Sequence, residues 1–149
     1  MTTPCLSCAL THGTKDTIGG VVTQSSNFQI RQDYSVPISG FMILATKRHI
    51  KSIDEFTKEE RLEFIELLYN TRQKMKTVLG IETIYLIQEE DSAHFHLWLF
   101  PRYSWMENLG QKLKSVKPIM EWAQQNLQTS ENIKEVKHTV EKLKKSFEI

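Results

Sequence analysis

The chain has 149 residues, of which 40% are hydrophobic and 25% are charged, and its formal net charge is +1. These values are those of an ordinary globular domain, which can bury a sizeable core without a disulfide or a metal. The near-neutral charge gives no electrostatic case for binding nucleic acid or a membrane surface. No apolar run approaches the roughly 20 residues that span a bilayer, and the first residues lack the basic and apolar regions of a signal peptide. We therefore expect a cytoplasmic protein.

The first third of the chain is predicted to hold a loop and three short strands. Residues 1–20 contain His-Gly and Gly-Gly pairs, which are typical of loops. Strands are predicted at 21–23 and 28–31, on either side of a Ser-Ser-Asn turn signal. The apolar run 41–46 predicts a buried strand.

A long helix is predicted over residues 58–79. Thr57 followed by Glu60 has the pattern of a capping box. Apolar residues then recur at helical spacing as far as Gly80, which is typical of a helix end. These apolar residues are Leu62, Ile65, Leu68, Tyr69, Met75 and Leu79.

The rest of the chain is predicted to form two strands and two helices. Residues 83–87 and 94–100 are expected to be antiparallel neighbours, the second strand ending at Pro101. Helices are predicted over 108–127 and 131–147, and the apolar stripe of the last one predicts packing onto the domain or a second subunit. The order of elements predicts an α+β fold, an antiparallel sheet with helices on one face.

Two histidines, His94 and His96, lie one residue apart in a predicted strand. Because strand side chains alternate between faces, both rings point the same way, together with Trp98 and Phe100. Burying two unpaired imidazoles on one face of a core strand costs free energy. Chemistry is the better explanation: a metal ligand, a nucleophile or a proton shuttle.

The two cysteines, Cys5 and Cys8, are spaced as Cys-x-x-Cys. A structural disulfide is not expected in a reducing compartment, which leaves a metal site, a redox motif or two unrelated thiols. The position of the pair at the N-terminus favours zinc, which takes about four nitrogen or sulfur ligands. His49 and His94 are candidates because strand ends converge at one rim of a sheet, and His12 is a competing ligand.

His96 stands apart from this metal set, and His138 is expected to be exposed on an amphipathic helix. A neutral imidazole held by a hydrogen bond at its other nitrogen is a competent nucleophile toward phosphorus. The alternative is that His96 is a partly buried strand residue bonded to a backbone carbonyl.

Several sequence features together resemble the histidine-triad (HIT) superfamily of nucleotide hydrolases and transferases. The family signature alternates three histidines with apolar residues and is often followed by Pro-Arg. Upstream it shows an Asn or Asp, then Pro, Gly and an apolar strand ending in Lys-Arg-His, and zinc-bearing members begin with Cys-x-x-Cys. The matching positions are Cys5, Cys8, Asp33, Pro37, Gly40, residues 41–49 and residues 94–102. The resemblance spans roughly residues 5–103.

The resemblance implies a fold, a mechanism and a zinc site. The fold would be a HIT-like antiparallel sheet of about five strands with a long helix on one face, in a nucleotide-binding domain over residues 1–107. The C-terminal helical extension, residues 108–149, would pack on the same domain, and two protomers would pair as a homodimer.

By motif position, His96 would be the nucleophile that attacks the α-phosphate of a nucleotide and forms a covalent nucleotidyl-histidine. A structural zinc would be held by Cys5, Cys8, His49 and His94. Asp33 aligns with the residue that contacts the ribose hydroxyls, and Ser92 and Trp98 complete the expected nucleotide-binding positions.

The sequence departs from the family pattern at Trp98, which replaces the third histidine, at Phe41, and at the acidic stretch 89–91. Three functions therefore remain open. The first is a nucleotide hydrolase or nucleotidyltransferase acting on a nucleoside phosphoramidate, a dinucleoside polyphosphate or a related nucleotide. The second is a non-catalytic nucleotide-binding or protein-interaction module on the zinc-braced scaffold. The third is a zinc hydrolase with a metal-bound water, which needs an open coordination position.

Overall fold

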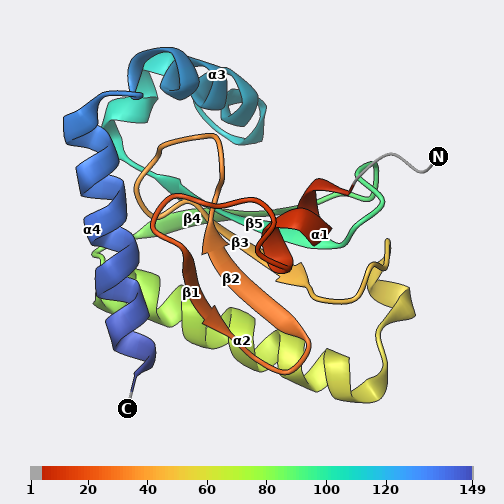
Figure 1. The fold of residues 1–149 in the computed structure, drawn as a ribbon. Helices are drawn as coiled ribbons and strands as arrows, with labels where there is room; N and C mark the ends of the chain where they lie inside the picture. The colour runs from red at the N-terminus through yellow and green to blue at the C-terminus, as the bar shows by residue number, and fades with distance from the viewer. Residues whose placement is uncertain (1–4, 149) are drawn as a thin grey trace.

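A five-stranded antiparallel sheet forms the centre of the molecule (Figure 1). The structure is a computed structural model that describes residues 5–148. The strands lie in the order β1-β2-β3-β5-β4, so β1 and β4 form the two edges. Their bounds are β1 (Val21–Gln24), β2 (Phe28–Gln32), β3 (Met42–Thr46), β4 (Thr83–Gln88) and β5 (His96–Arg102). The predicted α+β fold is confirmed.

Within residues 5–148, four α-helices and three short 3₁₀ helices surround this sheet. The α-helices are α1 (Leu6–Thr11), α2 (Lys58–Thr77), α3 (Val116–Asn126) and α4 (Ser130–Phe147). The 3₁₀ helices are η1 (Ile53–Glu55), η2 (Ser104–Leu109) and η3 (Leu113–Ser115). No helix within residues 5–148 is long and apolar enough to cross a membrane.

One face of the sheet packs against α2 and α4. Phe28, Leu44 and Leu97 share a buried core with Met75 of α2 and Val140 of α4. The alternation predicted for the last strand is confirmed, because Phe95, Leu97 and Leu99 all belong to this core. The capping box of α2 is present as predicted: Thr57 Oγ1 accepts from the Glu60 amide at 3.1 Å, and Glu60 Oε1 accepts from the Thr57 amide at 2.9 Å.

The opposite face of the sheet is covered in part by α3. Phe41, Ile43 and Phe100 form a second buried core with Ile119 and Ala123 of that helix. The expectation that all helices lie on one face is therefore wrong for α3. Figure 1 shows α3 and α2 on different sides of the sheet, with α4 running alongside.

Three local predictions are corrected by the structure. Residues 6–11 form a helix instead of a loop. β5 continues through Pro101, because beyond Leu99 it pairs with β4 alone, and an edge position tolerates a residue without an amide hydrogen. The helix expected from residue 108 begins only at Val116, since Gly110 and Lys112 have φ of 134° and 64°, which an α-helix does not contain.

Several of the apolar residues that predicted α2 lie on its exposed face. Leu62 and Ile65 are 61% and 54% exposed, and Tyr69 is exposed beside them. The buried positions of the helix are Glu60, Thr71 and Met75. The spacing thus predicted the helix correctly, although Leu62 and Ile65 are exposed and contribute little to the core.

Candidate functional site

The Cys-x-x-Cys pair is built into the start of α1. Cys5 is the N-cap, and its Sγ accepts from the amide of Cys8 at 3.4 Å. One helical turn therefore brings both sulfurs to the same side of the helix. The buried Arg31 of β2 holds this helix on the sheet, donating to Ser7 Oγ at 3.0 Å and to Thr11 Oγ1 at 3.1 Å.

Four ligand atoms converge beside α1. The two sulfurs and one ring nitrogen each from His49 and His94 all lie within 4.8 Å of one another. His94 Nδ1 lies 3.3 Å from Cys5 Sγ, 3.4 Å from Cys8 Sγ and 3.2 Å from His49 Nδ1. Tetrahedral zinc with ordinary bond lengths places its ligand atoms roughly 3.3–3.8 Å apart. The predicted zinc ligands are thus brought together in an arrangement that fits the metal.

His94 is prepared as a ligand by a bond on its other side. Its Nε2 lies 2.8 Å from the carbonyl oxygen of Thr46, and because a carbonyl only accepts, Nε2 carries the hydrogen. Nδ1 is then free to bind a metal, and this bond fixes the ring orientation. Burial lowers the pKa of His94, which keeps the imidazole in the neutral form that coordinates.

The two other histidines stay outside this cluster. His12 follows α1 as its C-cap and is exposed, and His138 is exposed on α4 as expected. Among residues 5–148, the cluster holds only the four predicted residues. Because four protein ligands fill a tetrahedral zinc, the site suits a structural metal and leaves no position for the metal-bound water of a zinc hydrolase.

His96 begins β5 two residues after the metal ligand His94. Its Nδ1 lies 3.0 Å from the carbonyl oxygen of His94 and 3.2 Å from Ser92 Oγ. Nδ1 therefore carries the hydrogen, and the lone pair is on Nε2. The backbone carbonyl bond expected of a partly buried strand residue is therefore present, and the same bond fixes the orientation of the His96 ring.

The turn before β5 is strained at Ala93. This residue has φ of 63°, a left-handed conformation that costs a residue with a Cβ roughly 1–2 kcal/mol. It turns the chain between Ser92 and His94, so that the Ser92 hydroxyl donates to the His94 carbonyl at 3.2 Å. No sequence pattern indicated this strained residue.

Trp98, at the third position of the histidine motif, packs as an apolar side chain. Its ring meets Phe41 in a T-shaped contact with centroids 5.6 Å apart and lies 6.3 Å from the His96 ring. It borders the buried core that α3 covers. Two of the three departures from the family pattern, Trp98 and Phe41, thus form one contact.

Asp33 lies just beyond β2 and is buried. Its Oδ2 accepts from the amides of Ser35 and Val36 at 3.1 and 2.8 Å. Burial raises the pKa of Asp33, while these amide bonds and the charge of Arg31 oppose the rise. In the described part of the chain no hydrogen bond joins Asp33 to His96: Asp33 bonds to Ser35 and Val36, and His96 to Ser92 and His94.

The acidic stretch before the histidines folds on itself. Glu89 Oε2 accepts from the amide of Asp91 at 2.7 Å, and both side chains are exposed. One of the three carboxylates therefore stabilises its own turn. The negative charge remains close in sequence to Ser92 and His96.

No protein-family model and no curated protein matches this sequence. Solved structures do match its fold. A hypothetical protein from Leishmania major gives a TM-score of 0.64 at 19% identity, over 76% of this chain and 82% of the other. A HIT family protein from Bacillus anthracis gives 0.62 at 20%, over 95% and 97%. A zinc-bound histidine triad family protein from Mycobacterium smegmatis gives 0.60 at 16%, over 95% and 96%.

These likenesses establish the fold of the chain. It is the fold of histidine-triad proteins, as the sequence motif predicted, and the Cys2His2 cluster is a site for a structural zinc.

Proposed function

We propose that the protein is a HIT-like nucleotide hydrolase or nucleotidyltransferase with His96 as its nucleophile. One observation carries this proposal: the carbonyl of His94 fixes Nδ1 of His96 and directs the lone pair of Nε2 outward. The carbonyl itself belongs to a residue of the metal cluster. Zinc, when bound, would lock the turn that positions the nucleophile.

In the proposed reaction, the lone pair of His96 Nε2 forms an N–P bond to the α-phosphorus of a nucleotide. The bond to the leaving group breaks, and that group departs with the bonding pair and takes up a proton from water. A water or a second acceptor then attacks the phosphorus as the N–P bond breaks, Nε2 regains its lone pair, and an attacking water gives up a proton that neutralises the hydroxide left by the first step. Hydrolysis and transfer share the covalent nucleotidyl-histidine, and whether water or another acceptor attacks it decides between the two outcomes.

Three further residues are proposed to contact the nucleotide. Ser92 can donate to a phosphate oxygen, and the indole N–H of Trp98 can donate but not accept. Asp33 is assigned to the ribose hydroxyls through its carboxylate. The substrate would be a nucleoside phosphoramidate, a dinucleoside polyphosphate or a related nucleotide.

The test is turnover of a nucleotide panel by wild type and His96→Ala. The panel contains adenosine phosphoramidate, diadenosine tri- and tetraphosphate, and nucleotide sugars with an acceptor phosphate. We expect His96→Ala to abolish turnover with folding and zinc content unchanged. His138→Ala is the matched control, because it removes an exposed imidazole on α4. Activity that survives in His96→Ala would exclude this mechanism.

Trp98 favours a second candidate, a non-catalytic nucleotide-binding or protein-interaction module. Its contact with Phe41 puts an apolar ring where the family has a hydrogen-bonding side chain. The comparison that separates the two candidates is wild type against Trp98→His. A large gain in turnover would mean that Trp98 limits the native site, whereas high native activity would exclude the binding module.

We further propose that the active form is a homodimer in the cytoplasm. Within residues 5–148, β4 is an edge strand that pairs with β5 alone and has a partly exposed surface, which suits pairing with a second copy. Reduced thiols, as the cytoplasm maintains them, are the form in which Cys5 and Cys8 bind metal.

A further inference from the structure

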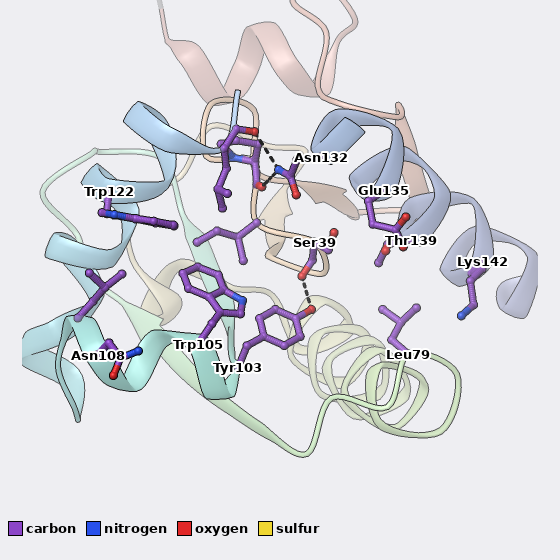
Figure 2. A pocket seen from close by; sticks show the side chains of 14 residues that line it. Ser39, Leu79, Tyr103, Trp105, Asn108, Trp122, Asn132, Glu135, Thr139 and Lys142 are labelled. Atoms are coloured by element: carbon purple, nitrogen blue, oxygen red, sulfur yellow. Dashed lines mark hydrogen bonds between the residues drawn. The ribbon is translucent and has the colours of Figure 1, made fainter. Parts of the chain in front are cut away.

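A large cavity opens beyond the C-terminal end of β5, at the opposite end of that strand from His96. Its volume is about 730 Å³, within the range of small-molecule sites. Figure 2 shows that its side chains come from η2, α3, α4 and the loop before β3. Tyr103 follows β5 directly, so on the order of 20 Å of strand separates it from His96. The cavity is therefore distinct from the proposed catalytic site.

One side of this cavity is aromatic. The rings of Tyr103 and Trp105 are nearly parallel, at 13° with centroids 6.4 Å apart, and Trp122 lies 5.4 Å from Trp105. Tyr103 is held in place because its hydroxyl donates to the carbonyl of Ser39 (Figure 2). A flat ring that enters the cavity can extend this stack.

The other side of the cavity is polar and carries both signs of charge. Glu135, Thr139 and Lys142 line it from α4, opposite the aromatic rings (Figure 2). Within residues 5–148, neither Glu135 nor Lys142 takes part in an ion pair. Asn132 donates through Nδ2 to the carbonyls of Pro37 and Leu127, which leaves its Oδ1 as an acceptor.

The aromatic side and the charged side of the cavity together indicate the chemistry of a ligand that would fit it. An aromatic ring is needed for the stack, an amino or ring N–H group suits Glu135 and Asn132, and an anionic group suits Lys142. A purely apolar molecule would leave both charges unpaired, and a simple anion would meet Glu135.

We propose that this cavity is a second ligand site, which binds a small planar aromatic molecule carrying both an amino donor and an anionic group. An aromatic amino acid and an adenine mononucleotide share this chemistry. Binding here depends on the C-terminal helices and does not require His96.

The experiment measures binding of L-tryptophan and adenosine monophosphate to the zinc-loaded full chain by calorimetry and by NMR. The chain has three tryptophans, so their indole N–H resonances can be assigned with single Trp→Phe variants. Alanine and ribose phosphate serve as probes that lack the ring. We expect one of the two aromatic probes to shift the Trp105 resonance saturably, with a Kd of about 1 mM or tighter.

Variants locate the site. Trp105→Ala should weaken binding roughly tenfold, as loss of a stacking partner does. Lys142→Met should weaken it roughly fivefold. The matched control is Lys137→Met, which removes an exposed lysine of the same helix outside the cavity. Trp105→Phe keeps a ring in place and provides a binding measurement if Trp105→Ala does not fold.

The outcomes separate this site from the catalytic proposal. Saturable binding that His96→Ala retains and Lys142→Met weakens supports the second site, whichever probe binds. If His96→Ala abolishes binding of adenosine monophosphate and Lys142→Met leaves it unchanged, the nucleotide binds at the His96 site. The proposal of a second site is then overturned for this probe. Failure of both probes to shift Trp105 overturns the proposal entirely and leaves the test of His96 unaffected.

Discussion

Arg31 is a buried cation. Within residues 5–148, its side chain donates hydrogen bonds only to neutral groups. It is 3% exposed and donates to Ser7, Thr11 and Gln29. Burial lowers its pKa to about 10, so it stays charged at neutral pH. Its bonds fix α1 on the sheet, and α1 holds both cysteines, so Arg31 acts as a positioning residue for the metal cluster.

Replacing Arg31 should therefore weaken metal binding without touching a ligand. We expect Arg31→Met to lower zinc affinity by about tenfold or more, the usual effect of losing a group that orients ligands. Competition with a chromogenic chelator measures this. Arg31→Lys keeps the charge but loses the forked geometry and should show most of the defect. Arg61→Met, on the exposed side of α2, should bind zinc as wild type does.

The cysteines themselves should couple zinc to stability. We expect Cys8→Ser to reduce bound zinc well below one per chain and to lower the unfolding free energy. The loss is about 4 kcal/mol where free zinc exceeds its Kd a thousandfold. Thermal unfolding with and without a chelator checks this. His12→Ala is the control, because His12 follows α1 but lies outside the cluster. Zinc loss in that control would contradict the assigned ligand set.

At the scale of elements, Glu60 connects the start of α2 to Arg48, which precedes His49 in the segment after β3. Its two carboxylate oxygens accept from Arg48 at 2.8 and 3.2 Å, and one also completes the capping box. The bond from Arg48 is the main cause that lowers the pKa of Glu60 below 4.5. Folding therefore favours the ionised carboxylate.

This linkage predicts how stability falls in acid. The contribution of Glu60 is fully present above its unfolded pKa near 4.5 and is lost as the pH falls through the lower folded value. Glu60→Gln should lower stability at neutral pH and flatten the decline below pH 4.5. Denaturant unfolding across this range measures both effects. Glu66→Gln, an exposed carboxylate of the same helix, should leave the acid profile unchanged.

The elements that sequence patterns predicted are those stabilised by local chemistry. The capping box of Thr57 specified the start of α2, and strict alternation specified the two faces of β5. The six-residue α1 escaped prediction because it is too short to show a helical period and is held by Arg31, distant in sequence. Likewise, the start of α3 depends on the positive φ of Lys112, which no residue preference indicates.

The residues of the candidate sites divide in the same way, into those that local sequence identifies and those that only the fold brings together. The metal ligands were predictable because residue type and motif spacing identify them without knowledge of the fold. The aromatic cavity was not, because Tyr103, Trp105 and Trp122 become neighbours only when α3 folds back over the sheet. The sequence around Trp105 and Trp122 does not distinguish a core residue from a residue that binds a ligand.

At the scale of the whole molecule, the two sheet edges are unequal. α4 lies against β1 at one edge, whereas in the part of the chain that the structure describes β4 at the other edge pairs only with β5. Leu86 of β4 is 53% exposed, and an uncovered edge strand with an apolar side chain is suited to pairing with another chain. If two copies join through β4, their sheets become one continuous sheet.

A charge on β4 should therefore separate the protomers. We expect light scattering to give a mass for the wild type of about twice the chain mass of 17.4 kDa. Leu86→Lys should shift it to the monomer by placing an ammonium group in the interface, with dimer affinity reduced by about a hundredfold. Leu62→Lys is the matched control, because Leu62 of α2 is as exposed, at 61%, but does not lie on β4. A monomeric wild type at every concentration, or a Leu86→Lys dimer as stable as wild type, would rule out assembly through this edge. If the dimer forms as expected, each His96 lies at the start of the strand next to the interface, so the turnover of Leu86→Lys also reveals whether the catalytic site needs the second copy.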